Sequence, residues 1–258
     1  MPYVTAKNRE SERGVVARTK AVMSLPMGDK AAIAEAVRRY LVDRSPRVRS
    51  AALDVVKDEN LREVEPDVLA LLSDKNHAVR YTAAECLGAL HEDEGIAASW
   101  LYPLLQDPNE LVRIETLESL GRIGDKKSVP LIVKRLDDDL PLVRSYAAHF
   151  VADLGGKKYL PELAKRKTLE KDDVARVGLA YALFTLGDSE QRSVLLELLS
   201  STNYAVRCAS ANSLSALDFT PAQHQAVVSA LSHAAQNALA VADRSTMERV
   251  EKELREQL

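Results

Sequence analysis

Aromatic residues, glycine, proline and cysteine are all scarce in this chain of 258 residues. Phe, Trp and Tyr together make up 5% of the sequence, and there are 10 Gly, 10 Pro and 2 Cys. So few Gly and Pro leave little room for long flexible linkers, which these residues favour. Hydrophobic residues nevertheless make up 46% of the chain. Leu, Val and Ala must therefore form most of the core, and small apolar residues allow helices to pack closely.

The cysteines and the apolar segments indicate a reducing compartment. Cys86 and Cys208 fall in the second and sixth copies of an internal repeat, too far apart for a disulfide in a stacked array. Unpaired thiols are typical of reducing surroundings. No run of about 18 apolar residues could span a membrane, and the first ten residues lack the apolar segment of a signal peptide. We therefore expect a cytoplasmic protein with no membrane contact.

The net charge of −3 conceals an uneven distribution. Residues 1–50 contain 11 Lys and Arg against 5 Asp and Glu, whereas residues 51–125 contain 6 against 16. A total close to neutrality makes nucleic acid an unlikely partner, because affinity for nucleic acid depends on neutralising phosphates. The gradient can steer a polar partner towards one part of the chain.

Motifs for catalysis and for metal or nucleotide binding are also absent. The chain contains no P-loop, no Gly-x-Ser-x-Gly and no dinucleotide fingerprint. The five histidines have no metal-ligand spacing; they are His77, His91, His149, His224 and His233. We therefore expect no enzyme, no catalytic residue, no metal and no cofactor. His149 and Tyr181 form a candidate proton-transfer pair, although contact with a partner is the favoured role.

What the sequence does contain is an arginine that returns at nearly constant spacing. The copies lie 31 to 33 residues apart, at Arg49, Arg80, Arg113, Arg144, Arg176 and Arg207. An acidic or small polar residue precedes each by six positions, at Asp43, Asp74, Asp107, Asp138, Glu170 and Ser201. A period between 20 and 50 residues indicates a stacked array of helical repeats.

Each repeat is predicted to contain a first helix, a turn at the acidic residue, and a second helix that begins just before the arginine. The expected pairs are 29–42 and 46–57, 64–73 and 77–90, 95–106 and 109–123, 128–136 and 141–154, 158–168 and 172–186, and 189–200 and 203–217. Pro103 falls inside a first helix and predicts a kink. We expect residues 1–28 to form an N-terminal cap or half repeat, 29–217 six repeats, and 218–258 C-terminal capping helices. An oligomerisation helix at the C-terminus is the alternative to a cap on a monomer.

The repeats resemble a known family. The stretch Leu71-Leu72-Ser73-Asp74-Lys75-Asn76-His77-Ala78-Val79-Arg80 looks like a HEAT repeat, as does Leu104-Leu105-Gln106-Asp107-Pro108-Asn109-Glu110-Leu111-Val112-Arg113. The short period is similar to the HEAT-like repeats of the phycobilisome-lyase type. The resemblance implies an all-α fold, a right-handed, armadillo-like α-solenoid of about six repeats with helical caps. It does not identify the function, because such repeats serve many functions.

The resemblance also implies that the acidic residues and the arginines form a ladder between neighbouring layers. An arginine that is half-buried needs an acceptor, and the guanidinium fork fits a carboxylate. The expected members are Asp43, Arg49, Asp74, Arg80, Asp107, Arg113, Asp138, Arg144, Glu170, Arg176 and Arg207. Because Ser201 replaces the acid in the sixth repeat, Arg207 is the arginine expected to be available for a ligand.

The second helices of such a solenoid line its concave face, where these arrays usually bind. At 100° per residue, the positions one, five and eight residues after each arginine lie opposite the core stripe. The expected contact residues are Tyr81, Glu85, Ile114, Glu118, His149, Tyr181, Phe184 and Asn212, and Val177 is also expected to point outward. An exposed apolar and aromatic patch marks an interface. The alternative is that the twist of the array buries these side chains between layers.

We therefore predict a non-catalytic interaction module, either a scaffold, an adaptor or an inhibitor of the immunity type. It would bind a protein or peptide on the concave face, and the sequence does not identify that partner. One alternative, implied by the repeat type, is a bilin lyase or a tetrapyrrole-chaperone-like protein. Another is weak nucleic-acid binding through the basic N-terminal region. Deoxyhypusine hydroxylase, a HEAT-repeat di-iron enzyme, needs several His-Glu steps, whereas this chain has the single step His91-Glu92.

Overall fold

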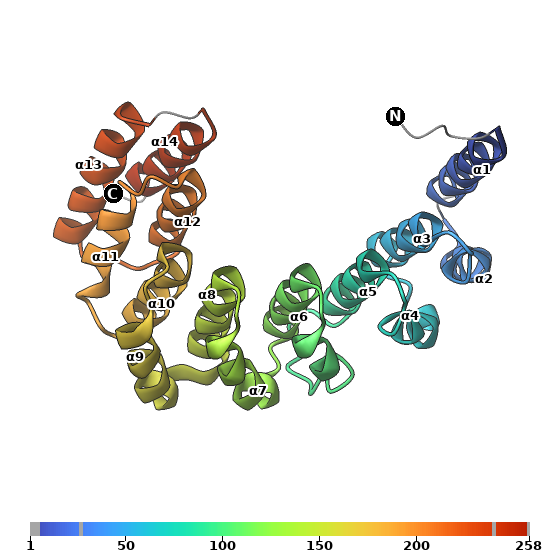
Figure 1. The fold of residues 1–258 in the computed structure, drawn as a ribbon, viewed down its shortest axis with the longest axis horizontal. Coiled ribbons are helices and arrows are strands. Elements are labelled where there is room, and N and C mark those ends of the chain that lie inside the picture. Colours follow the sequence, from blue (N-terminus) through green and yellow to red (C-terminus); the bar gives the residue numbers. More distant parts are fainter. Residues whose placement is uncertain (1–5, 26–27, 239–240, 257–258) are drawn as a thin grey trace. The chain divides into compact units, whose positions relative to one another are not determined.

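The computed structural model describes residues 6–25, 28–238 and 241–256, and the side chains of the first helix from residue 12 onward. The expected end of the N-terminal cap at Pro26, and the outermost residues of both expected caps, lie outside these ranges. The described residues contain helices and connecting segments and no strand, so the all-α class is confirmed. The chain divides into two compact units, residues 1–128 and 129–258. Each unit is a stack of helices of the α-solenoid class (Figure 1).

Unit 1 is built from a row of second helices backed by first helices. Its elements are α1 (Ala6–Met23), α2 (Lys30–Leu41), α3 (Pro46–Asp58), the 3-10 turn η1 (Arg62–Val64), α4 (Glu65–Leu71), α5 (His77–Leu90), the 3-10 helix η2 (Tyr102–Gln106), α6 (Glu110–Ile123) and the 3-10 turn η3 (Lys126–Ser128). Helix α1 packs on α3, α3 on α5, and α5 on α6. Figure 1 shows these four in one row, with α2 and α4 on the other side.

Unit 2 repeats this plan and ends in a helical hairpin. Its elements are α7 (Val129–Val133), the 3-10 turn η4 (Lys134–Asp137), α8 (Pro141–Phe150), the π-helical turn η5 (Val151–Gly155), the 3-10 turn η6 (Gly156–Tyr159), α9 (Leu160–Leu169), α10 (Asp173–Thr185), α11 (Gln191–Leu198), α12 (Tyr204–Ser215), α13 (Pro221–Gln236) and α14 (Val241–Arg255). Here α8, α10, α12 and α14 pack in sequence as the inner row.

The starts of the second helices follow from their capping residues. The side chains of Asn76, Asn109, Asp172 and Asn203 each accept a hydrogen bond from a backbone N–H in the first turn of the helix that follows. Such caps satisfy N–H groups that the helix itself leaves unpaired. At α3 and α8 the first helical residue is instead a proline, which has no N–H to satisfy.

The prediction of a first helix at 95–106 in the third repeat is wrong. Helical structure there is limited to Tyr102–Gln106, in the 3-10 form. The preceding loop is tied down by the fully buried carboxylate of Asp125, which accepts hydrogen bonds from the Ala98 N–H at 2.9 Å and the Tyr102 hydroxyl at 2.8 Å. The carboxylate thus pairs the backbone N–H of Ala98 and the hydroxyl of Tyr102 without a helix. Pro103 lies at the start of the 3-10 helix and does not kink a longer one.

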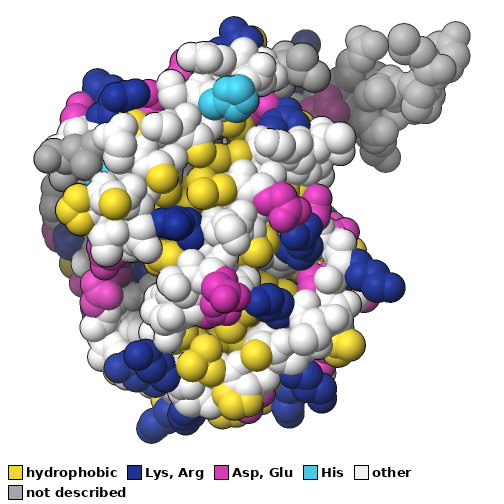
Figure 2. Space-filling view, turned by 90° about the vertical axis from the view of Figure 1, so that its left-hand side faces the viewer, with side chains coloured by type: hydrophobic (Ala, Val, Ile, Leu, Met, Phe, Trp, Pro, Cys, Tyr) yellow, Lys and Arg dark blue, Asp and Glu magenta, His cyan; other side chains and the backbone are white. Residues whose placement is uncertain are grey.

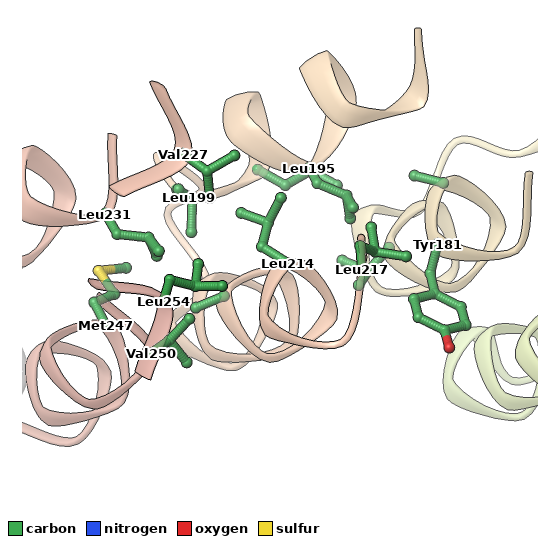
Figure 3. Packing of buried hydrophobic residues seen from close by; sticks show 14 of the residues in the cluster. Tyr181, Leu195, Leu199, Leu214, Leu217, Val227, Leu231, Met247, Val250 and Leu254 are labelled. Atoms are coloured by element: carbon green, nitrogen blue, oxygen red, sulfur yellow. The ribbon is translucent and has the colours of Figure 1, made fainter. Parts of the chain in front are cut away.

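The core of unit 2 is continuous from α10 to α14. It contains Leu195, Leu214, Val227, Leu231 and Met247, each fully buried. Figure 3 shows these side chains pointing towards one another, with Tyr181 at one end of the cluster and its hydroxyl directed away from the labelled core residues. The C-terminal hairpin therefore shares one hydrophobic core with the preceding repeats.

The outer side of unit 2 has no single dominant patch. On the face that carries α9, α11 and α13, small hydrophobic groups alternate with Lys, Arg, Asp and Glu (Figure 2). Within residues 6–25, 28–238 and 241–256, none of the helices combines the length and the hydrophobicity that crossing a bilayer requires.

Candidate functional site

The recurring arginine forms a clamp that joins its own turn to the next repeat. Arg80 donates from Nε and Nη2 to the two carboxylate oxygens of Asp107, both at 2.7 Å. Its Nη1 donates to the backbone carbonyl of Asp74 at 2.8 Å, six residues back. Asp107 also accepts from the Asn109 N–H at 2.9 Å. Burial opposes ionisation of Asp107, but these hydrogen bonds outweigh it, and the pKa of Asp107 is lowered.

Similar contacts occur in other repeats of both units. The ion pairs that join consecutive repeats are Arg18–Asp43 at 2.7 Å, Arg49–Asp74 at 2.8 Å and Arg144–Glu170 at 2.8 Å. The bond to the carbonyl six residues back recurs from Arg49, Arg113, Arg144 and Arg207. A bidentate, charge-assisted pair fixes geometry as well as contributing energy. These contacts place the expected ladder residues together, and their role in stability remains a prediction.

The ladder departs from the expected register in the fifth and sixth repeats. Arg176 pairs with Asp173 at 2.7 Å and with Glu197 at 3.2 Å, because Ser201 offers a hydroxyl in place of a carboxylate. The expectation that Arg207 is available for a ligand is wrong. Its Nε donates at 2.6 Å to Asp243, which is fully buried. Asp243 lies in α14, outside the repeat register, so no spacing in the sequence pointed to it.

The second helices of unit 1 carry four carboxylates with one ion-paired lysine among them in the described residues, at Asp54, Asp58, Glu85 and Glu118. Lys57 on α3 lies 2.7 Å from Glu85 on α5 and 3.8 Å from Asp54. Burial opposes the charge of Lys57, but the hydrogen bond to Glu85 and the negative charges of Glu85, Asp54 and Asp58 together outweigh it, so the pKa of Lys57 is raised. Within the described ranges, the carboxylates of Asp58 and Glu118 have no cation within 4 Å. We call the surface formed by Asp54, Asp58, Glu85 and Glu118 the acidic face.

A buried glutamate lies beneath the acidic face. Glu115 on α6 is 2% exposed and is hydrogen-bonded by the hydroxyl of Tyr81 on α5. The Ser119 hydroxyl lies 3.1 Å from its carboxylate. Burial raises the pKa of Glu115 to about 7, with a smaller contribution from the negative charge of Glu118. Burial and the neighbouring Glu115 likewise raise the pKa of Tyr81. Glu115 was not predicted from the sequence, because α6 also contains Glu110 and Glu118 and nothing in its pattern sets Glu115 apart.

A glycine allows α5 and α6 to approach at this point. A Cβ at Gly88 would lie 2.7 Å from the Ser119 hydroxyl oxygen, which itself bonds the Ala84 carbonyl at 2.9 Å. Arg122 then reaches back across the junction, with Nη1 3.9 Å from Glu115. The acidic face therefore rests on closely packed helices, whose side chains hold one another in place.

Three residues expected to point outward are buried. Ile114 and Tyr181 are each 8% exposed, and Val177 is 3% exposed. Two of them, Ile114 and Val177, directly follow the recurring arginine. At the same position in α5, the Tyr81 hydroxyl bonds Glu115 on α6, and Val177 and Tyr181 pack in the core cluster that runs from α10 to α14. The alternative of burial between layers therefore holds for Val177 and Tyr181, and the expectation that Ile114 points outward is wrong. Glu85, Glu118 and Phe184 are half-buried, and Asn212 is exposed.

In unit 2 the expected contact residues form an aromatic group. The rings of His149 and Tyr181 stack with centroids 4.1 Å apart and planes inclined by 13°. His149 Nε2 also lies 3.1 Å from an Asp153 carboxylate oxygen. Phe184 meets Phe219 edge to face. The face-to-face stack does not align the Tyr181 hydroxyl with an imidazole nitrogen for direct transfer between the two rings, and a role of the pair in proton transfer stays a prediction.

Two further side chains of the described residues bear on binding or reactivity, Asn212 and Cys86. Asn212 accepts a hydrogen bond from Arg249 at 2.7 Å. Burial raises the pKa of the Cys86 thiol to about 12, which makes it a poor nucleophile because the thiolate is the reactive form. Among the described residues, no group of three or more His, Cys, Asp and Glu side chains could hold a metal ion.

The comparisons with known proteins agree with this architecture. A family model for HEAT repeats matches residues 34–98 and 97–184, which is more than half of the chain. The chain belongs to the HEAT-repeat family. The complex of CpcE and CpcF of phycocyanin lyase from Nostoc sp. PCC7120 has a chain with a TM-score of 0.63 and 17% identity, over 91% of this HEAT-repeat protein and 97% of that chain. At that identity the likeness shows a shared fold.

A curated relative covers only part of the sequence. Deoxyhypusine hydroxylase from Eremothecium gossypii is 33% identical over 122 residues, which are 46% of this chain and 37% of the relative. The HEAT-repeat protein therefore spans well under two thirds of that relative's length. The match shows that the two proteins share similar repeats over this segment. The activity of the relative is a property of that protein.

Proposed function

We propose that this HEAT-repeat protein is a non-catalytic interaction module that binds another protein on the acidic face of unit 1. The observation that carries the proposal is that the four carboxylates of the acidic face, on adjacent second helices, have one ion-paired cation among them in the described residues, Lys57. Lys57 is shared between Asp54 and Glu85, while Asp58 and Glu118 have no ion pair within the described residues. Repeat arrays commonly bind partners on such extended surfaces.

The packing beneath the face supports a preformed binding surface. Glu115, Tyr81 and Ser119 hold α5 against α6 through hydrogen bonds that are themselves buried. A surface that is already ordered loses little conformational entropy on binding, so more of the contact energy appears as affinity. The uneven charge of unit 1 also favours fast, salt-sensitive association with a cationic surface.

The activities of the named relatives are not part of this proposal. The lyase likeness supports the fold, and the hydroxylase match covers 37% of that protein. The one His-Glu step of this chain places His91 against Glu94, at 2.7 Å, and leaves Glu92 exposed. An interaction role needs only the surface that the described residues provide.

A capture experiment with matched variants tests the proposal. Immobilised wild-type protein is exposed to native lysate of its source and the retained proteins are identified by mass spectrometry, beside the Glu85→Lys/Glu118→Lys variant. The Glu63→Lys/Glu92→Lys variant has the same change in charge at exposed positions on η1 and in the loop after α5. We expect one protein to be retained by the wild type and the control but not by the acidic-face variant. Equal retention by all three would refute the proposal.

A further inference from the structure

A hollow lies at the end of the acidic face, between α1, α2 and α3. Its volume is about 390 Å³, within the range of about 300–1,000 Å³ that is typical of ligand pockets. Val22, Ile33 and Ala51 line it with buried apolar side chains. Met23, the last residue of α1, forms one wall and is 72% exposed. A methionine left in solvent beside an apolar hollow is available to pack against an incoming side chain.

The mouth of the hollow is negatively charged. Asp54, Asp58 and Glu59 line it from the last turns of α3 and the residue after that helix. The carboxyl end of a helix carries a partial negative charge of its own, which adds to theirs. The nearby cation, Lys57, is held by Glu85. Burial raises the pKa of Asp54, and the charges of Glu85 and Asp58 raise it further, so an added cation would relieve repulsion among these carboxylates.

We propose that the hollow binds a large apolar side chain of the partner, and that Lys or Arg residues lie next to that side chain in the partner's sequence. This inference rests on the proposed function and adds the chemistry of the binding segment. The apolar lining selects the anchor, and the three carboxylates select the flanking cations. Nucleic acids, acidic peptides and phosphorylated segments are disfavoured because the same carboxylates repel them.

The size of the effect follows from burial. Moving a large apolar side chain from water into an apolar site stabilises by about 1.5–3 kcal/mol, which corresponds to a factor of roughly 10 to 150 in affinity. The contribution of the flanking cations depends on ionic strength, because exposed charges are screened over about 10 Å at 0.1 M salt. Anchor and charge can therefore be measured separately.

The test uses the full chain and a display library of random 12-residue peptides. Peptides enriched on the wild type are sequenced, and the strongest is labelled for fluorescence anisotropy. Its affinity is measured for the wild type, for Met23→Ser and for Asp58→Asn/Glu59→Gln. The matched controls are Val42→Ser, which alters a side chain that is 78% exposed elsewhere, and Glu63→Gln/Glu92→Gln.

We expect enriched peptides with one large apolar residue beside Lys or Arg. Changing that residue to Ser should weaken binding at least tenfold, Met23→Ser and the double charge variant should each weaken it severalfold, and the controls should leave it unchanged. Enrichment of acidic or uncharged peptides, failure to enrich any peptide, or equal binding to all variants would overturn the inference. The proposed function is tested at Glu85 and Glu118, so it stands if capture depends on those residues while the peptide test fails.

Discussion

Removing the carboxylate of Asp107 should destabilise unit 1 by an amount that a surface ion pair cannot produce. Its side chain is 4% exposed and that of Arg80 is 13% exposed. The Asp107→Ala substitution breaks two hydrogen bonds of 2.7 Å from Arg80 and one from the Asn109 N–H. A buried ion pair that loses one partner leaves an uncompensated charge, which costs about 3–5 kcal/mol.

The assay is urea unfolding followed by circular dichroism at pH 7. The Asp67→Ala variant is the internal reference, because Asp67 pairs with Arg38 at 3.3 Å while both side chains are about 40% exposed. Exposed pairs contribute about 0–1 kcal/mol, so the free energy of unfolding should fall much less in this variant. A shift in the midpoint at constant slope identifies the change as one of stability.

A double substitution separates the ion pair from the space that it fills. Replacing Arg80 with Met and Asp107 with Leu removes both charges and keeps apolar volume, which is often neutral for a buried pair. We expect this variant to recover most of the stability lost by Asp107→Ala. If Asp107→Ala lies within 0.5 kcal/mol of Asp67→Ala, the clamp does not hold the repeats together and the ladder has another role.

Three further perturbations test other parts of the structure. Because the pKa of Glu115 is raised to about 7, its contribution to stability should fall by about 2 kcal/mol as the pH rises from 5 to 8. In urea unfolding measured across that pH range, the Glu115→Gln variant should lack this pH dependence. The pKa of Glu170 is lowered to about 2, so its contribution to stability is present above about pH 4.5 and should be lost as the pH falls towards 2. The Glu170→Gln variant should therefore show a smaller fall in melting temperature than the wild type between pH 5 and pH 2. A Cβ at Gly178 would lie 2.3 Å from the backbone oxygen of Ser145, so Gly178→Ala should lower the melting temperature sharply, whereas Gly14→Ala in α1, whose nearest contact is 3.5 Å, should leave it unchanged or raise it.

The second helices could be predicted because their signals are local. The recurring arginine, the polar cap and the apolar stripe all fall within about ten residues, and α5 was predicted at the bounds 77–90 that the structure shows. The first helix of the third repeat failed because its loop is satisfied by Asp125, which lies 27 residues beyond Ala98. Propensity within a window contains no information about such a distant acceptor.

The candidate site was predictable in part. Helical periodicity placed Glu85 and Glu118 towards solvent, and both are half-exposed. It misplaced Val177 and Tyr181 because a helical wheel treats each helix in isolation, whereas neighbouring helices bury the flanks of the wheel. Met23 and the hollow beside it were not predicted from the sequence, for a different reason. Its hollow is created where the last turn of α1 meets α3, and the sequence pattern of neither helix contains that junction.

The clamp and the acidic face use different residues of the same repeats. Arg49, Arg80 and Arg144 each bond a carbonyl six residues back and a carboxylate of the next repeat, at the turn between first and second helix. The position five residues after the arginine takes no part in those bonds. It holds Asp54, Glu85 and Glu118 in successive repeats of unit 1, and His149, Tyr181 and Asn212 in unit 2, of which Tyr181 is buried. We expect the clamps to stabilise the stack at the turns, so that substitution at the solvent-facing members of this position changes what the surface binds while the helices stay packed.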